Sequence, residues 1–166
     1  QVLQDFCEEE EFELLGIGTG RVVITPKDAN IAFKVARYGV SARFGDGKEA
    51  NRIEARRWQN IDENRLMPLY AASEEKNWLA CPIAEMLNAN EEADSEKIIT
   101  EIKKDLRPYS DELCLRDIGE GNIRRIDEEW YWTDYGQPII DESQLYGLVT
   151  ELDNSPDNLD NNYNNS

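Results

Sequence analysis

Three side chains in the second half of the sequence carry oxygen atoms suited to phosphoryl chemistry. Asp117 is followed five positions later by Asn122, and twelve positions after that by Asp134. Moving a phosphoryl group crowds negative oxygens together, and cations held by oxygen ligands lower that cost. Asn122 and Asp134 are suitable ligands for Mg²⁺, while Asp117 could orient a substrate hydroxyl and accept its proton. Considered alone, Asp134-Tyr135-Gly136 is more typical of an ordinary turn.

A glycine-rich segment upstream could supply backbone groups for phosphates. Gly16, Gly18 and Gly20 stand at alternate positions, and β-branched residues follow them. Glycine lets backbone amides approach a phosphate that a side chain would block. The segment therefore predicts a turn running into a strand over residues 16–24.

Lys34 lies in a second expected strand, residues 30–38. Side chains alternate between the faces of a strand, so Lys34 shares its face with the small residues Ala32 and Ala36. This leaves room for a flat ring beside an ammonium group, as a nucleotide base and its phosphates would require. The alternative is a solvent-facing lysine on an edge strand.

A helix expected over residues 48–61 favours an internal role for this lysine. Glu54 is a carboxylate on an otherwise apolar stripe of that helix, which also contains Ala50, Trp58 and Ile61. Because burying an unpaired charge is costly, Glu54 should have a cationic partner inside the fold. Lys34 is the expected partner, and Glu49 is a less favoured alternative to Glu54.

Taken in order, these motifs resemble the protein-kinase-like superfamily over about residues 14–136. They are the glycine-rich segment, Ala32-Phe33-Lys34, the helix glutamate, Arg116-Asp117-x-x-x-x-Asn122 and Asp134-Tyr135-Gly136. The resemblance implies ATP and Mg²⁺ as cofactors. It also implies a nucleotide-binding set formed by Gly16, Gly18, Gly20, Val22, Ala32 and Lys34.

The same resemblance implies a role for each of the polar residues. Lys34 would contact the α- and β-phosphates with Glu54 as its helix partner, and Asp117 would be the catalytic-loop aspartate. Asn122 and Asp134 would be the metal ligands.

Departures from the family pattern suggest a minimal kinase or a pseudokinase. The glycine segment is expected to be one residue shorter than G-x-G-x-x-G-x-V. Leu115 replaces the usual histidine, and Gly119 replaces a lysine that contacts the γ-phosphate. Thirty residues follow Gly136, without an Ala-Pro-Glu motif, so we expect a truncated C-terminal lobe.

The expected fold is α+β and kinase-like. Residues 1–87 should form a small antiparallel sheet lobe with one crossing helix. This lobe should begin with a charged lead-in over residues 1–15 and end with a hairpin of residues 66–72 and 77–84. Residues 88–152 should form a reduced, mainly helical lobe with the catalytic-type loop. We expect helices from Asp94 or Ser95 to residue 106 and over 141–152, a strand over 129–133 with core tryptophans, and a disordered Asn/Asp-rich tail over 153–166.

Composition limits the possible partners and compartments. Against 18 Lys and Arg, the chain has 35 Asp and Glu, which gives a net charge of −17 and opposes direct binding to DNA or RNA. Such charge is typical of a high-salt, haloarchaeal cytoplasm, and an acidic mesophilic protein or a DNA mimic are alternatives. The absence of histidine excludes Ser-His-Asp and Cys-His catalysis. Three widely spaced cysteines, Cys7, Cys81 and Cys114, favour buried thiols in a reducing compartment.

We expect a cytoplasmic protein, since no stretch is long enough to cross a bilayer and the acidic N-terminal segment is unlike a secretory signal. Three functions remain open. The first is an ATP-dependent phosphotransferase acting on itself or on a small molecule. The second is a pseudokinase-type adaptor or structural module with a protein partner, and the third is an acidic interaction protein.

Overall fold

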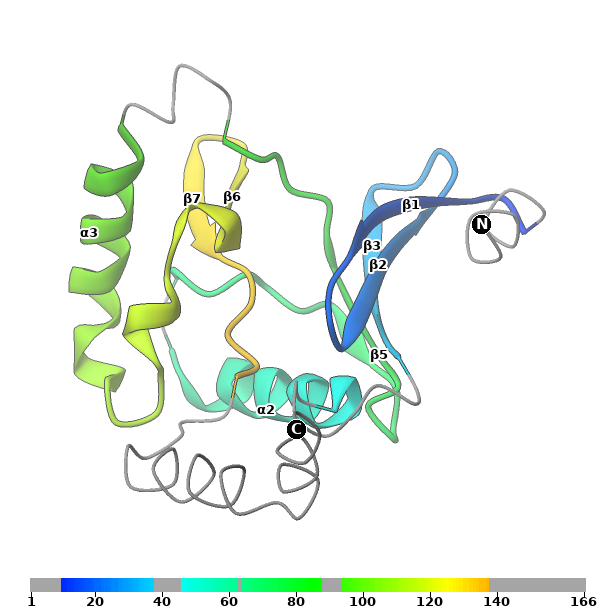
Figure 1. Ribbon diagram of the computed structural model, residues 1–166, viewed down its shortest axis with the longest axis horizontal. Coiled ribbons are helices and arrows are strands. Elements are labelled where there is room, and N and C mark those ends of the chain that lie inside the picture. The colour runs from blue at the N-terminus through cyan, green and yellow to red at the C-terminus, as the bar shows by residue number, and fades with distance from the viewer. Residues whose placement is uncertain (1–9, 38–45, 63, 88–93, 138–166) are drawn as a thin grey trace, which may run out of the picture.

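A computed structural model describes residues 10–37, 46–62, 64–87 and 94–137 of the chain (Figure 1). Five antiparallel strands form one sheet in the order β1-β2-β3-β5-β4. Their bounds are Phe12–Ile17 for β1, Arg21–Pro26 for β2, Ile31–Ala36 for β3, Ala71–Ala72 for β4 and Trp78–Pro82 for β5. Among the described residues up to 87, this sheet and the helix α2 confirm the α+β arrangement expected there, a small antiparallel sheet with one crossing helix.

Helix α2, Gly47–Asn60, packs against β3 and β5. It begins where the Asp46 side chain accepts a hydrogen bond from the Lys48 amide at 2.9 Å, which satisfies one of the unpaired amides of the first turn. Asn51, Glu54 and Arg57 are all buried on it. Because they are spaced three residues apart, they lie on neighbouring turns of one face. Helix α2 therefore buries a polar stripe beside the apolar Ile53 and Ala55, and Asn51 and Glu54 of that stripe bind Lys34 of the sheet.

A second group of elements lies on the other side of the molecule in Figure 1. Helix α3, Ser95–Leu106, packs against the hairpin of β6, Ile123–Ile126, and β7, Glu129–Trp132. Three short 3₁₀ turns connect the helix to the hairpin: η3, Arg107–Tyr109, η4, Leu115–Asp117, and η5, Glu120–Asn122. Within the described residues, no helix has both the length and the apolar character needed to cross a membrane.

One apolar core joins the two groups of elements. Trp132 and Tyr135 are its largest fully buried side chains, and Ile102 and Leu106 of α3 are buried beside them. The Tyr135 hydroxyl donates a hydrogen bond of 2.7 Å to the Met67 carbonyl, so the core has a satisfied polar group. The expectation that the tryptophan side chains belong to the core is confirmed for Trp132, and Trp130 is half-buried against the same core.

Several expected elements differ from the observed ones. Residues 1–15 are expected to be a charged lead-in with one or two strand residues, but β1 begins at Phe12. Its exposed positions include the apolar Leu15 and Ile17, so polar and apolar residues do not alternate along the strand. The expected strand over 66–72 is reduced to two residues, because Met67 pairs instead with β7 through a 2.9 Å bond to the Trp132 carbonyl. Strand β6 was not expected.

Other expectations concern residues that the structure does not describe. The lobe boundary at 88–93, the helix over 141–152 and the tail over 153–166 lie outside the described residues, as does Cys7. Of the remaining thiols, Cys81 is buried and Cys114 is half-buried. Burial raises the pKa of the Cys81 thiol, so this side chain behaves as a small apolar group.

Candidate functional site

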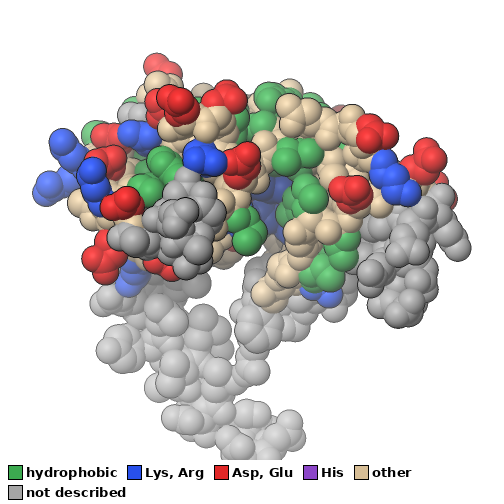
Figure 2. Space-filling model, turned by 90° about the horizontal axis from the view of Figure 1, so that it is seen from above, with side chains coloured by type: hydrophobic (Ala, Val, Ile, Leu, Met, Phe, Trp, Pro, Cys, Tyr) green, Lys and Arg blue, Asp and Glu red, His purple; other side chains and the backbone are tan. Residues whose placement is uncertain are grey.

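A cavity of about 350 Å³ lies between the sheet and the segment that follows β5. The sheet contributes Val23, Ala32 and Lys34 to its lining. Thr133, the residue before Asp134, also lines it. The other lining residues, most of them apolar, are Leu15, Gly16, Met67, Cys81, Pro82, Ile83, Ala84, Met86 and Arg124. Figure 2 shows hydrophobic side chains on both sides of a hollow, with basic side chains at its bottom.

The register of β2 corrects the expectation for Val22. Val22 is buried on the opposite face of the strand and does not line the cavity, whereas Val23 does, because successive strand residues point to opposite faces. Counted back from Val23, the pattern G-x-G-x-x-G-x-V has its full length and places Arg21, instead of Gly20, at the third glycine. With Val23 as the last residue of the pattern, the segment is not shortened.

Lys34 and Glu54 form the ion pair that the sequence predicts. The Lys34 ammonium contacts Glu54 Oε1 and also donates to the backbone carbonyl of Thr133. Glu54 is fully buried at the middle of α2, and Lys34 is 7% exposed on β3. Glu49, the less favoured alternative to Glu54, pairs instead with Arg52 on the surface. The bond to Thr133 places Lys34 next to the Asp134 backbone.

Arg21 joins this pair and was not expected from the sequence. Its Nη1 atom donates to Glu54 Oε2 at 2.6 Å and to Asn51 Oδ1 at 3.3 Å. Its Nη2 atom forms an ion pair with Asp134 Oδ1. Glu54 therefore has two cationic partners, and Asp134 is linked to the same network through Arg21. One feature of the sequence could have indicated Arg21. When the glycine pattern is aligned to end at Val23, Arg21 stands at the position of its third glycine.

The network stabilises the ionised form of Glu54. Burial by itself would raise the pKa of this carboxyl, but the charges and hydrogen bonds of Lys34 and Arg21 outweigh burial and lower it. Burial likewise opposes the charged form of Arg21, but Glu54 and Asp134 raise the pKa of its guanidinium. Glu54 and Arg21 are therefore both charged at neutral pH.

The lowered pKa of Glu54 predicts that the stability of the fold depends on pH through the ionisation of this carboxyl. Since its folded pKa lies below the ordinary value of 4.5, its stabilisation should be complete above that pH and be lost as the pH falls through the lowered folded pKa. The free energy of unfolding, measured with urea, should therefore be higher for wild type than for Glu54→Gln at neutral pH. This difference between the two proteins should become smaller as the pH falls below 4.5. A difference that stayed constant from pH 7 to pH 3 would contradict this assignment.

The three glycines of the turn do not lie at one place. Gly16 lines the cavity, whereas Gly18 and Gly20 line a separate hollow of about 170 Å³ at the start of α2. Arg37 holds this turn, because its backbone amide donates to Gly20 at 2.8 Å and its side chain donates to Gly18 at 2.7 Å. Two carbonyls of the turn are therefore already engaged within the protein.

Two hydrogen bonds connect Asn122 to Asp117 and to Thr133, the residue before Asp134. The side-chain nitrogen of Asn122 donates to the Asp117 carbonyl at 3.0 Å, and the backbone carbonyl of Asn122 accepts from the Thr133 backbone amide at 2.8 Å. Asn122 thus lies beside Thr133 and links it to Asp117, and both Asp117 and Asn122 are part of short 3₁₀ turns. The structure therefore places the expected catalytic loop next to the expected metal-ligand segment.

Arg57 is a second buried cation that the sequence did not indicate. It lies one helical turn after Glu54 and donates to the carbonyls of Tyr135 and, at 2.7 Å, of Gln137. Burial lowers the pKa of its guanidinium, and the charge of Asp117 is among those that act in the opposite direction. Arg57 therefore fixes the backbone after Asp134 to α2.

The Arg21 guanidinium competes with Mg²⁺ for one of the two expected metal ligands. One carboxylate oxygen of Asp134 already accepts the guanidinium, whereas the Asn122 side chain donates to the Asp117 carbonyl through its nitrogen, and its oxygen is the atom that would bind a metal. Among the residues described, no cluster of three or more Asp, Glu, Cys or His side chains could hold a metal ion. A protein cation thus occupies the place at Asp134 where the metal was expected.

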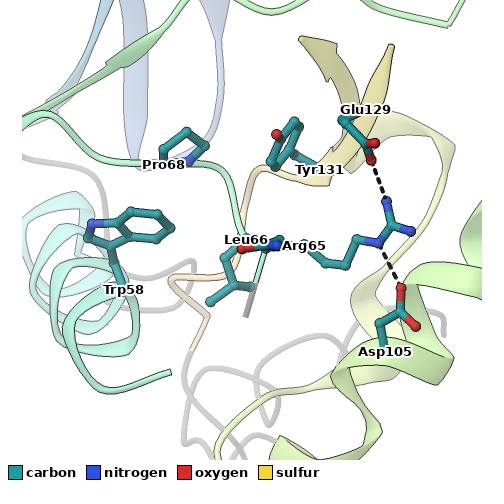
Figure 3. Close-up of a pocket in the computed structure, with 8 residues that line it drawn as sticks. Trp58, Arg65, Leu66, Pro68, Asp105, Glu129 and Tyr131 are labelled. Atoms are coloured by element: carbon teal, nitrogen blue, oxygen red, sulfur yellow. Dashed lines mark hydrogen bonds and ion pairs between the residues drawn. The ribbon is translucent and has the colours of Figure 1, made fainter. Parts of the chain in front are cut away.

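A larger hollow of about 470 Å³ lies elsewhere, between α2, α3 and β7 (Figure 3). Arg65 crosses it, and its guanidinium binds Asp105 at 2.7 Å and Glu129 at 3.3 Å. Because two carboxylates already neutralise this cation, the hollow offers little to attract an anionic ligand. The cavity beside Lys34 is therefore the better candidate site for an anionic ligand.

No family model and no curated protein matches the chain. Among solved structures, the kinase domain of PknI from Mycobacterium tuberculosis is 14% identical, with a TM-score of 0.47 over 78% of this chain and 59% of that domain. A single-residue mutant of the same domain is 15% identical, with a TM-score of 0.45 over 82% of this chain and 65% of the domain. The chain thus spans about three fifths of the length of the kinase domains that it matches.

Proposed function

We propose that this protein binds a purine nucleotide, with ATP as the first candidate, in the cavity beside Lys34. The observation that supports it best is a buried ammonium group at an otherwise mostly apolar cavity. Val23 and Ala32 provide flat apolar walls for a base, and a small side chain at position 32 leaves the space open. Such a combination of apolar walls and few polar groups is typical of small-molecule sites.

Lys34 is the residue that would contact the phosphates. An ammonium group has three N–H donors, and Glu54 and the Thr133 carbonyl accept two of them. The third donor remains for a phosphate oxygen, while Glu54 fixes the position of the group. The protein has a net charge of −17, so this local cation is needed to offset the repulsion of an anionic ligand.

Phosphotransfer from this nucleotide is the catalytic form of the proposal. Asp117 would accept the proton of a hydroxyl on the protein itself or on a small molecule. The second candidate is a pseudokinase-type module that binds nucleotide and acts through a protein partner. The ion pair between Arg21 and Asp134 favours this second candidate, because it neutralises the carboxylate expected to hold the metal for transfer.

Lys34→Met is expected to weaken ATP binding about tenfold or more, since a lost charge-assisted hydrogen bond is worth about 1.5–3 kcal/mol. Adenosine, which has no phosphates, should bind wild type and variant with similar dissociation constants. Isothermal titration calorimetry with both ligands measures the two effects. Glu54 keeps Arg21 as a partner in this variant, so the fold should be retained.

Lys76→Met provides a matched control, because Lys76 lies away from the cavity in the turn before β5. Its ATP affinity should equal that of wild type. If neither ATP nor adenosine binds to wild-type protein, nucleotide binding is not the function. If Lys34→Met weakens the binding of ATP and of adenosine by the same factor, the phosphates do not contact Lys34.

A further inference from the structure

Arg21 connects two carboxylates that come from distant parts of the chain. Glu54 lies on α2, and Asp134 lies after β7, and the flat guanidinium of Arg21 reaches both through different nitrogens. The Arg21 side chain is 11% exposed, so it is enclosed by the fold instead of extending into solvent. A planar fork of donors suits such a double contact better than a single ammonium would.

The charges of this cluster balance without any added ion. Glu54 and Asp134 contribute two negative charges, and Lys34 and Arg21 contribute two positive ones. A divalent cation at Asp134 would meet the guanidinium on the same carboxylate, and two like charges at such a short distance repel strongly in a partly buried site. Removing Arg21 would leave the cluster with one net negative charge, which a cation could then neutralise.

The neighbouring hollow gives no other place for a phosphate. It lies beside the start of α2, and Arg21 lines it together with Asp46, Glu49 and Asp134. Because Arg21 is already paired with Asp134, the carboxylates of Asp46 and Glu49 would repel an anionic group there. The phosphates of a nucleotide in the cavity should therefore stay on the side of Lys34.

We propose that Arg21 is a built-in counter-cation for Asp134, so that the protein binds its nucleotide without a divalent metal ion. This inference rests on the proposed nucleotide site and adds to it the form of the ligand, a metal-free nucleotide. It also assigns a role to the one residue that replaces a glycine in the phosphate-binding segment.

The test compares ATP binding in Mg²⁺ and in EDTA at matched ionic strength. For wild type, the two dissociation constants should agree within about twofold. Arg21→Gly restores the third glycine of the pattern, and its ATP affinity should be about tenfold or more higher in Mg²⁺ than in EDTA. Arg52→Ala is the matched control, because Arg52 is an exposed arginine on α2, and it should behave like wild type in both buffers.

A direct readout uses Mn²⁺ alone, followed by electron paramagnetic resonance. Wild type should show no saturable Mn²⁺ binding, whereas Arg21→Gly should gain a site that disappears in the double variant with Asp134→Asn. A wild-type protein that binds ATP only when Mg²⁺ is present would overturn the inference and leave nucleotide binding intact. That comparison needs no variant, so it decides the question even if Arg21→Gly does not fold.

Absence of binding by ATP and adenosine in both buffers would instead remove the nucleotide site, and the inference with it. The inference would also be overturned by an Arg21→Gly protein that folds, binds no Mn²⁺ and has the same ATP affinity in Mg²⁺ and in EDTA. Asp134 would then not bind a metal ion even without Arg21.

Discussion

Glu54→Ala should lower the free energy of unfolding by about 3–5 kcal/mol, the range seen when one partner of a buried ion pair is removed. Glu54 is fully buried and binds both Lys34 and Arg21. Its loss would leave two cations enclosed beside each other without their shared counter-charge. Urea denaturation at neutral pH measures the change, and Glu54→Gln should recover part of the loss because it keeps a hydrogen-bond acceptor.

Glu49→Ala is the matched control for this experiment. Glu49 lies on the same helix, is half exposed, and pairs with Arg52 at the surface. Exposed pairs of this kind contribute about 0–1 kcal/mol, so its removal should have little effect on unfolding. Equal destabilisation by the two substitutions would show that the buried cluster does not support the fold.

Gly136→Ala should destabilise the protein by about 3 kcal/mol, the upper end of the range for overpacking. A β-carbon at Gly136 would collide with the backbone carbonyl of Ala50 in α2. Backbone within a helix cannot move aside as a flexible side chain can, so either α2 or the segment after Asp134 must shift. Because Arg21 and Lys34 both bind that segment, ATP affinity measured by calorimetry should fall as well.

Gly119→Ala tests whether this effect is specific to the close approach. A β-carbon there would meet no atom within 4 Å, and the backbone is extended. Its free energy of unfolding should remain within about 0.5 kcal/mol of wild type. A Gly136→Ala protein as stable as Gly119→Ala would mean that α2 does not pack tightly against this segment.

Much of the site followed from local chemistry in the sequence. Glu54 falls on the buried face of a helix, and a carboxylate in that position requires a cation, so its pairing with Lys34 could be predicted before any coordinates. The bounds of α2 and α3 were also predicted to within one or two residues, because helical periodicity and their caps are local signals.

The tertiary structure decided what depends on register and on distant contacts. Val23 pairs with Lys34 across β2 and β3 and therefore shares its face, which places Val23, not Val22, at the cavity. Arg21 meets Glu54 and Asp134 across 33 and 113 residues of sequence, and no local pattern specifies such partners. The sequence by itself therefore determined that Glu54 had to be buried with a cation such as Lys34. Folding decided that Arg21 joins this pair and binds Asp134 as well, because only packing brings distant segments within reach of one guanidinium.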